Sequence, residues 1–129
     1  MKSPNAENNL IVNLTFNFAL DIINYVELLQ VEKRFVMANQ LMKSGTSIGA
    51  NVKEAQNAES KQDFIHKMKI AAKEADETQY WLALCTHSGH YNPPASLSLQ
   101  AESILKVLNK KIGTSKRKSP LQYFLSCFM

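Results

Sequence analysis

The chain has 129 residues, enough for one domain, and its 45% hydrophobic content is ordinary for a soluble globular protein. Because only 4 Gly and 4 Pro interrupt it, long helices are favoured over many short strands. Cys85 and Cys127 lie too far apart in sequence to suggest a disulfide framework, and no window approaches the roughly 20 apolar residues of a membrane-spanning helix. The N-terminus also lacks a signal peptide's apolar core, so we expect a cytoplasmic protein without a membrane partner.

The net charge of +4 is unevenly distributed along the chain. Residues 1–102 contain 9 Lys and Arg against 11 Asp and Glu, whereas residues 103–129 contain 6 basic residues and no acid. Such asymmetry indicates either a contact with nucleic acid or an acidic membrane, or a solvated helix face followed by a soluble tail. The candidate nucleic-acid contacts in this segment are Lys106, Lys110, Lys111, Lys116, Arg117 and Lys118.

Residues 1–8 are polar and predict a flexible start, and the first helix is predicted over residues 9–29. This helix has two adjacent apolar stripes at helical spacing, which together make the wide apolar face of a bundle helix. One stripe is Val12, Phe16, Ala19, Ile23 and Val26, and the other is Ile11, Phe18, Ile22, Tyr25 and Leu29.

A second helix is predicted over residues 32–57, because apolar and small residues recur there every three or four positions: Ala38, Leu41, Gly45, Ile48, Val52 and Ala55. Gly45 and Gly49 each cost a helix about 1 kcal/mol relative to alanine, which is tolerated where a neighbouring backbone must approach closely. The surrounding run predicts tight helix–helix contact in a close pair with the third helix: Ser44, Gly45, Thr46, Ser47, Ile48, Gly49, Ala50 and Asn51. The alternative is a loop that divides the helix, which the uninterrupted spacing on both sides disfavours.

Ser60, with Asp63 three residues later, is typical of a helix N-cap and predicts a third helix that runs to about His87. Its seven core positions keep a strict 4-3 spacing: Phe64, Met68, Ala71, Ala75, Thr78, Leu82 and Cys85. Gly89 is the predicted C-cap.

Pro93 and Pro94 can begin a helix but not interrupt one, and they predict a shorter fourth helix that Gly113 ends. Residues 114–129 are then a basic linker and an apolar tail, which we expect to dock on the bundle or on another chain. Short connections predict an all-α, up-down-up-down antiparallel four-helix bundle over residues 9–113, in which the second and third helices are the longest.

No catalytic residues and no cofactor are predicted, because no phosphate-binding glycine loop or nucleophile signature is present. Cys85, His87 and His90 could hold a metal only with a fourth ligand, and a buried core cysteine is the favoured interpretation. Tyr80 and Trp81 lie beside the seam of the third helix, where one of them could fill the core and the other face outward. The residues that we assign to a candidate subunit interface are Tyr80, Trp81, Tyr123, Phe124 and Phe128.

The stretch from Gln40 to Ala55, centred on Thr46-Ser47-Ile48-Gly49-Ala50-Asn51, resembles the signature of the 23S rRNA-intervening sequence proteins. Asp63-Phe64-Ile65 and Tyr80-Trp81-Leu82 also resemble that family, and the likeness covers about residues 10–112. The resemblance implies an up-down four-helix bundle that assembles as a ring-shaped homopentamer. It also implies kinship with the accessory protein of diversity-generating retroelements, a basic pentamer that binds nucleic acid and a reverse transcriptase, and it implies no catalytic activity.

The chain departs from the family pattern at several places. Lys43 stands where the family often has arginine, Gly45 where it often has alanine, and Ala55 where it often has glycine. The junction between the second and third helices is often rich in arginine, whereas residues 56–59 read Gln-Asn-Ala-Glu. These differences weaken the case for a nucleic-acid contact at that junction.

Two functions are therefore considered. The first is a non-enzymatic oligomeric scaffold or adaptor that engages RNA, DNA or a nucleic-acid-processing enzyme, such as a reverse transcriptase, through the basic segment. The alternative is a protein–protein interaction module without nucleic-acid affinity, whose apolar tail docks on a neighbouring subunit or a partner.

Overall fold

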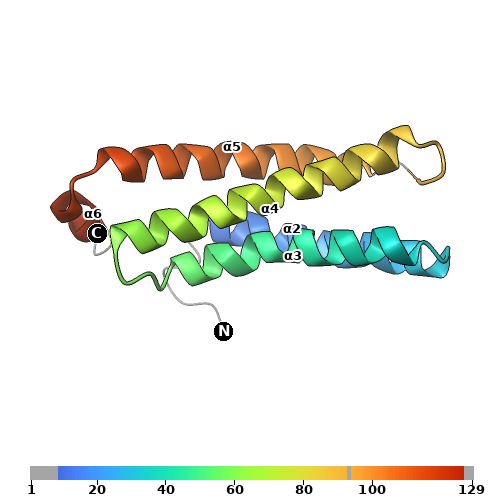
Figure 1. The fold of residues 1–129 in the computed structure, drawn as a ribbon, viewed down its shortest axis with the longest axis horizontal. Helices are drawn as coiled ribbons and strands as arrows, with labels where there is room; N and C mark the ends of the chain where they lie inside the picture. The colour runs from blue at the N-terminus through green and yellow to red at the C-terminus, as the bar shows by residue number, and fades with distance from the viewer. Residues whose placement is uncertain (1–8, 93, 127–129) are drawn as a thin grey trace.

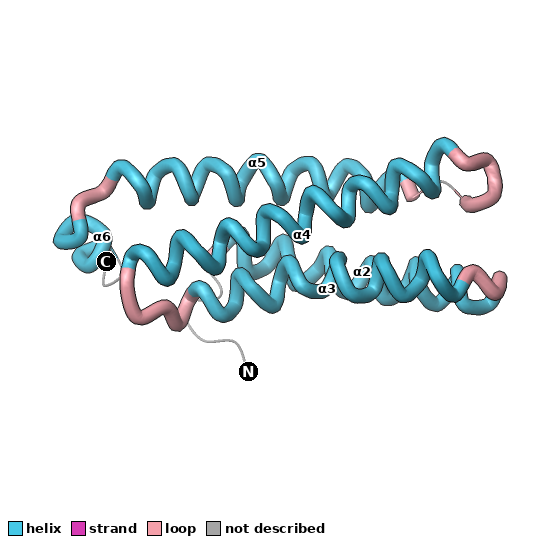
Figure 2. The backbone as a smooth tube through the Cα atoms, viewed as in Figure 1, coloured by secondary structure: helices cyan, strands magenta, loops and turns pink. Residues whose placement is uncertain are grey.

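The computed structural model describes residues 9–92 and 94–126, and these residues form helices without any strand. Four long helices, α2 (Leu10–Val31), α3 (Phe35–Ala55), α4 (Lys61–His87) and α5 (Ala95–Arg117), precede the short helix α6 (Pro120–Ser126). Figure 1 shows consecutive long helices running antiparallel, and Figure 2 shows loops that join them at alternating ends. The predicted up-down-up-down bundle is confirmed, whereas the predicted flexible start, residues 1–8, lies outside the described residues.

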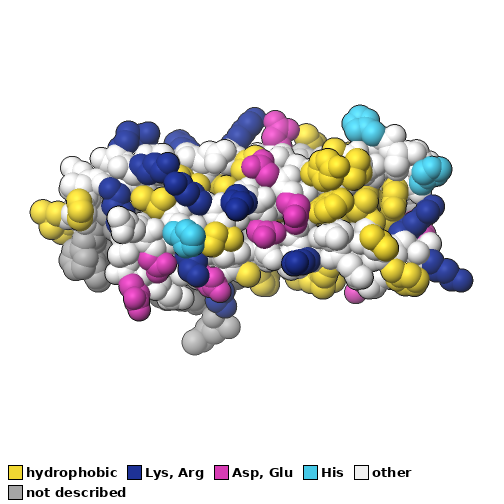
Figure 3. Space-filling model, viewed as in Figure 1, with side chains coloured by type: hydrophobic (Ala, Val, Ile, Leu, Met, Phe, Trp, Pro, Cys, Tyr) yellow, Lys and Arg dark blue, Asp and Glu magenta, His cyan; other side chains and the backbone are white. Residues whose placement is uncertain are grey.

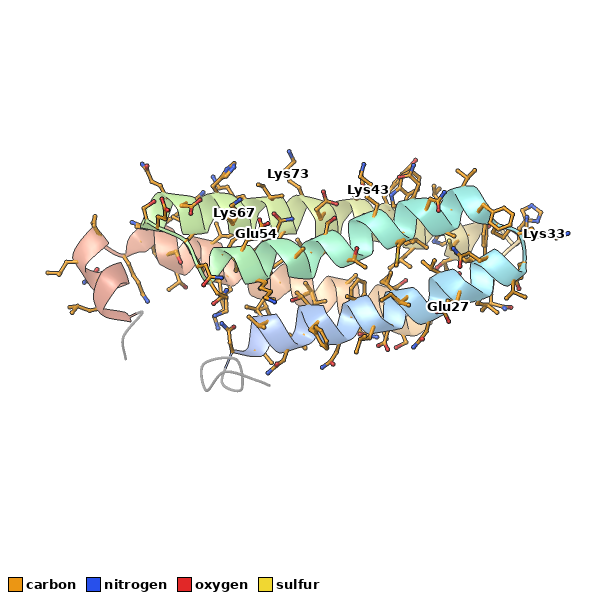
Figure 4. All side chains as sticks on the ribbon, turned by 90° about the horizontal axis from the view of Figure 1, so that it is seen from below. Glu27, Lys33, Lys43, Glu54, Lys67 and Lys73 are labelled. Atoms are coloured by element: carbon orange, nitrogen blue, oxygen red, sulfur yellow. The ribbon has the colours of Figure 1, made fainter. Side chains whose placement is uncertain are left out.

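The four long helices pack in a closed cycle around one core. Each long helix packs against its neighbours in the chain, and α2 closes the cycle against α5 with the least contact of the four pairs. α2 and α4 are therefore diagonal to each other, on opposite sides of the bundle (Figure 4). None of the described helices is long and apolar enough to cross a membrane.

The buried face of α2 is narrower than the face predicted from its two apolar stripes. In the stripe that contains Phe18 and Ile22 every residue but the half-buried Tyr25 is buried, whereas in the other stripe only Val26 is buried and Phe16 is 62% exposed. Both stripes are equally apolar, so the choice between them depends on where α3 and α5 lie. The assignment of Phe16 to the core is therefore wrong.

All six core positions predicted for α3 are buried, and the small-residue run lies inside this helix rather than in a loop. The two glycines, however, face α2 and not α4. A Cβ atom at Gly45 would lie 2.8 Å from Cγ1 of Ile22, and one at Gly49 would lie 3.2 Å from the backbone oxygen of Thr15. The close pair that the glycines permit is thus α2 with α3.

α4 begins and ends as the sequence predicts. The Ser60 hydroxyl accepts a hydrogen bond from the Asp63 N–H at 3.0 Å, and the Asp63 carboxylate accepts one from the Glu59 N–H at 3.2 Å. These bonds satisfy one backbone donor of the first helical turn, at Asp63, and one just before the N-cap, at Glu59. Gly89, with φ of +76°, lies just beyond the C-cap Ser88, where a left-handed backbone favours glycine.

The prediction that α5 ends at Gly113 is wrong, because the helix continues for four more residues to Arg117. Ile112 and Ser115 are both buried, so the buried face of the helix continues beyond Gly113. Packing of these residues outweighs the cost of about 1 kcal/mol that a glycine imposes on a helix. The predicted linker is accordingly short, and Lys116 and Arg117 belong to the helix. The length order is also wrong, since α4 has 27 residues but α3 has 21, fewer than the 23 of α5.

Candidate functional site

The six basic residues predicted as nucleic-acid contacts all lie on the second half of α5 or at its C-cap, Lys118. Four are exposed, and Lys111 and Lys118 are half-buried. Lys106 is partly neutralised, because its Nζ lies 3.3 Å from Oε1 of Glu102 in an i, i+4 ion pair. The exposed members without an ion pair to an acid in the described chain are Lys110, Lys116 and Arg117.

The bundle topology adds lysines of α4 to this group, because the first half of α4 lies beside the second half of α5. The proximity of the Lys69 amine on α4 lowers the pKa of the Lys116 amine on α5. Lys73 follows Lys69 by one helical turn and points away from the bundle (Figure 4). We call the resulting set the α4/α5 basic surface: Lys61, Lys69, Lys73, Lys106, Lys110, Lys116 and Arg117.

Lys61 joins the start of α4 to the end of α5. Its Nζ donates hydrogen bonds to the backbone oxygens of Lys116, at 3.4 Å, and of Lys118. The last carbonyls of a helix lack partners within the helix, so an amine from α4 satisfies them and complements the negative end of the α5 dipole. Sequence reasoning missed Lys61, Lys69 and Lys73, although the predicted antiparallel order of the last two helices is the signal that places them there.

Figure 3 shows Lys and Arg side chains gathered over the half of one face where α4 begins and α5 ends. Hydrophobic side chains gather over the other half of the same face, and acidic side chains lie between the two groups and also along the lower edge of the basic half. Among the acids, the pKa of Glu74 is raised by burial and by the charge of Glu77, against the opposing effects of Lys43 and Lys73. Glu74 and the other acids that follow Lys73 on α4, Asp76 and Glu77, therefore lie at the end of the basic surface, whereas Asp63 lies in the first turn of the same helix.

The small-residue motif satisfies its polar groups within its own helix. The hydroxyls of Ser44, Thr46 and Ser47 donate to the carbonyl oxygens four residues earlier, and the Asn51 amide does the same to Ser47. Ala50 is exposed, and Ile48 is completely buried. With its polar groups satisfied inside α3, the motif packs against α2 through Gly45 and Gly49.

The structure does not bring Cys85, His87 and His90 together as ligands. The Cys85 side chain is buried in the core, and burial raises the pKa of its thiol against a hydrogen bond with Tyr25. His87 and His90 are exposed beside a shallow depression, and the described residues contain no cluster of three side chains that could hold a metal ion. Arg34 closes this end of the bundle, stacking 5.2 Å from the ring centre of Tyr91 and donating to the His90 carbonyl.

The aromatic candidates for an interface are divided between exposed and partly buried positions. The Tyr80 ring is 58% exposed, and it contacts the half-buried Trp81 ring edge-on at 5.2 Å between centroids. Trp81 packs against the core, and its buried Nε1 has no hydrogen-bond partner among the residues that the structure describes. Tyr123 and Phe124 belong to α6, but their side chains are outside the described set, as is all of Phe128.

A second apolar surface, absent from the sequence predictions, lies on α2 and along its seam with α5. Phe16 and Leu20 are exposed on α2 by 62% and 46%, and Leu99 on α5 by 69%. Leu14 and Leu99 line a shallow groove of about 240 Å³ at the seam, where α2 and α5 make the least contact. Exposed apolar groups of this kind are characteristic of surfaces that associate with other chains.

The comparisons with known proteins agree with this architecture. The family model described as 23S rRNA-intervening sequence protein matches residues 7–110. The chain is also similar to a crystal structure from Bacteroides thetaiotaomicron VPI-5482, which is described as a protein with unknown function from the S23 ribosomal protein family. The two sequences are 40% identical, the TM-score is 0.76, and the match covers 80% of this chain and 98% of that one. A search of curated proteins found no match. The chain therefore belongs to the 23S rRNA-intervening sequence protein family.

Proposed function

We propose that this protein is a non-enzymatic oligomeric scaffold that binds RNA or DNA through the α4/α5 basic surface. One observation carries the proposal: neighbouring helices α4 and α5 expose basic side chains that have no ion pair to an acid among the described residues, namely Lys69, Lys73, Lys110, Lys116 and Arg117. Like charges held together cost free energy in the unbound protein, and a polyanion offsets that cost.

The side chains on this surface favour phosphate contacts over base recognition. Lysine is a flexible point charge, and lysine contacts with phosphates carry no sequence information. The same surface is suited to guide a nucleic acid to a processing enzyme bound to the scaffold. We therefore expect binding that tolerates sequence changes and weakens steeply with salt.

Titration of labelled RNA and DNA at about 50 and 200 mM salt tests this function, because several phosphate contacts should together make the affinity fall at least 100-fold over that range. The matched control is the triple variant Lys69→Glu, Lys110→Glu, Arg117→Glu, whose substitutions are all at surface positions outside the core. We expect the triple variant to bind neither nucleic acid at the lower salt concentration. Absence of binding by the wild-type chain at that concentration would refute the proposed function.

The proposed assembly uses α2, because this helix exposes apolar side chains on the side of the bundle opposite α4. Contact between copies through Phe16 and Leu20 would leave the α4/α5 basic surface open in every subunit. Several copies of a weak phosphate site on one particle raise the apparent affinity by avidity. The family resemblance implies five copies.

Light scattering tests this assembly through the mass of the particle. We expect a multiple of the 14.5 kDa chain mass for the wild-type protein and a single chain mass for Phe16→Glu, Leu20→Glu, because buried unpaired carboxylates oppose an apolar interface. Helical circular dichroism should be unchanged, since both positions are exposed. A double variant that keeps the wild-type mass would exclude α2 as the interface.

The alternative function, a protein–protein interaction module, is favoured by α6. Leu121 and Leu125 lie one helical turn apart on this short helix and are exposed by 66% and 51%, so its contact with α4 leaves apolar surface uncovered. A chain ending at Lys118 separates the two functions. The alternative predicts that the truncated chain forms a particle whose mass falls by more than the deleted residues, and that neither the full nor the truncated chain binds nucleic acid. Nucleic-acid binding that the truncated chain retains would instead support the scaffold function.

A further inference from the structure

The short helix α6 is capped by its own residues but is little covered by the bundle. The Ser119 N–H donates to Oε1 of Gln122 at 2.9 Å, and the Gln122 N–H donates to the Ser119 hydroxyl at 3.1 Å. This reciprocal cap, with Pro120 at the first helical position, gives the segment a defined helical start. The principal contact of α6 with the bundle, which is with α4, is smaller than any contact between neighbouring long helices.

This contact leaves an apolar face of α6 open to solvent. Leu121 and Leu125 lie one helical turn apart and are 66% and 51% exposed. A helix of seven residues is marginal on its own in water, because nucleation is costly and packing supplies most helical stability. An apolar surface that covers the two leucines would therefore stabilise α6.

The seam between α2 and α5 presents an apolar surface of the matching kind. Its shallow groove of about 240 Å³ is lined by Leu14, Leu99 and Ile104, together with Gln100 and Ser103. Because α2 and α5 make the least contact of the four neighbouring pairs, apolar side chains remain uncovered here, and Leu99 is 69% exposed. The groove can therefore receive apolar side chains from another segment.

The groove of the same molecule is out of reach of α6. Leu99 lies about 27 Å from Arg117 along α5, at about 1.5 Å of rise per residue. The two residues between α5 and α6 span about 7 Å at most, and α6 adds about 10 Å. Figure 1 shows α6 at the end of the bundle where α5 ends. Even a helix folded straight back along α5 would end before Leu99, so an α6 in the groove must come from another molecule.

The charges that border the groove and those that precede α6 are opposite in sign. α2 contains the exposed acids Asp21 and Glu27 and no lysine or arginine. The Asp21 carboxylate accepts a hydrogen bond from Gln100 of the groove at 3.2 Å, and it forms no ion pair within the described residues. The chain that leads into α6, residues 116–118, is entirely basic. An α6 seated in the groove would bring this basic segment to the acidic side of α2.

We propose that α6 of one copy docks in the α2/α5 groove of a second copy of this chain, where Leu121 and Leu125 cover Leu99. The docking rests on the proposed function, since it deepens the assembly through α2 by naming the segment that meets the groove beside this helix. Each copy presents its α6 and its groove at different places, so the contact is head-to-tail and passes from copy to copy in one direction.

Light scattering of two variants and of their mixture tests the docking. The tail variant is Leu121→Glu, Leu125→Glu, and the groove variant is Leu99→Glu. Each should weaken association at least about 10-fold, because a carboxylate would be buried without a partner. Just above the concentration at which the wild-type chain assembles, each variant should therefore have the mass of a single chain. Their mixture should recover a particle of two chains, since the groove variant keeps an intact α6 and the tail variant keeps an intact groove.

Val36→Glu is the matched control, because Val36 is an apolar residue that is 79% exposed on α3, the helix diagonal to α5. This variant should keep the wild-type mass. Helical circular dichroism should be the same for all variants, since every substituted side chain is exposed. Equal losses of mass in Val36→Glu and in the groove variant would overturn the docking.

The outcomes separate the docking from the function on which it rests. A tail or groove variant that keeps the wild-type mass, or a mixture that remains single chains, overturns the docking. If the wild-type chain is still assembled and binds RNA with a steep salt dependence, the proposed function stands in that case. A mixture that recovers two chains, with no RNA binding at low salt, supports the docking and overturns the nucleic-acid part of the function. A wild-type chain with the mass of a single chain overturns both the docking and the assembly.

Discussion

Replacement of Phe18 by alanine is expected to lower the free energy of unfolding by about 3–5 kcal/mol. The Phe18 ring is completely buried and is among the largest side chains of the core. Truncation removes its apolar surface from the core and leaves a cavity that helices α3 and α5 can fill only in part. Urea denaturation followed by helical circular dichroism measures the change.

Phe16 supplies the matched control, since it is the same residue type two positions away on the same helix. Its ring is 62% exposed, so Phe16→Ala should change the free energy of unfolding by less than about 0.5 kcal/mol. Both variants should be compared at a protein concentration at which they have the same mass. Equal losses would contradict the orientation of α2 and would place both apolar stripes in the core.

The second large effect is expected at Gly45, where Gly45→Val should lower the free energy of unfolding by about 1–3 kcal/mol. The first added carbon would already lie 2.8 Å from Cγ1 of Ile22, and the two methyl groups of valine need further room. Either α2 moves away from α3 or Ile22 leaves its position in the core. Thermal and urea denaturation both report the loss.

Gly113→Ala also tests the effect of adding a side chain at a helical glycine, but here the free energy of unfolding is expected to rise. An added Cβ at Gly113 would meet only the Arg117 side chain, at 3.4 Å, so no helix has to move. Because Gly113 lies inside α5, alanine should raise the free energy of unfolding by up to about 1 kcal/mol through helix propensity alone. A destabilised Gly113→Ala variant would indicate that α5 ends near this residue, as its sequence suggested.

The fold could be predicted from the sequence wherever a helix has a single apolar seam. α3 and α4 each carry one, and their buried positions follow it almost without exception. α2 carries two apolar stripes of equal strength, and periodicity alone cannot indicate that Phe18 faces the core while Phe16 faces out. The end of α5 was missed for a related reason, because burial of Ser115 beyond Gly113 depends on α4 and not on local propensity.

Part of the candidate site could also be predicted from the sequence. The charge asymmetry identified all six basic residues on α5 and at its C-cap. Lys61 and Lys69 were not identified, because they lie about 50 residues earlier and join the surface only when α4 packs against α5. An antiparallel bundle places the beginning of one helix beside the end of the next, so the topology already contained this information in outline.

The dependence of RNA affinity on salt concentration tests the central claim most directly, since it counts the phosphates that the protein neutralises. The account predicts a steep linear fall of log affinity with log salt for the wild-type chain, and no measurable binding for the Lys69→Glu, Lys110→Glu, Arg117→Glu variant. Affinity that is absent at low salt, or that is the same in the wild-type chain and the triple variant, would contradict a nucleic-acid role for the α4/α5 basic surface.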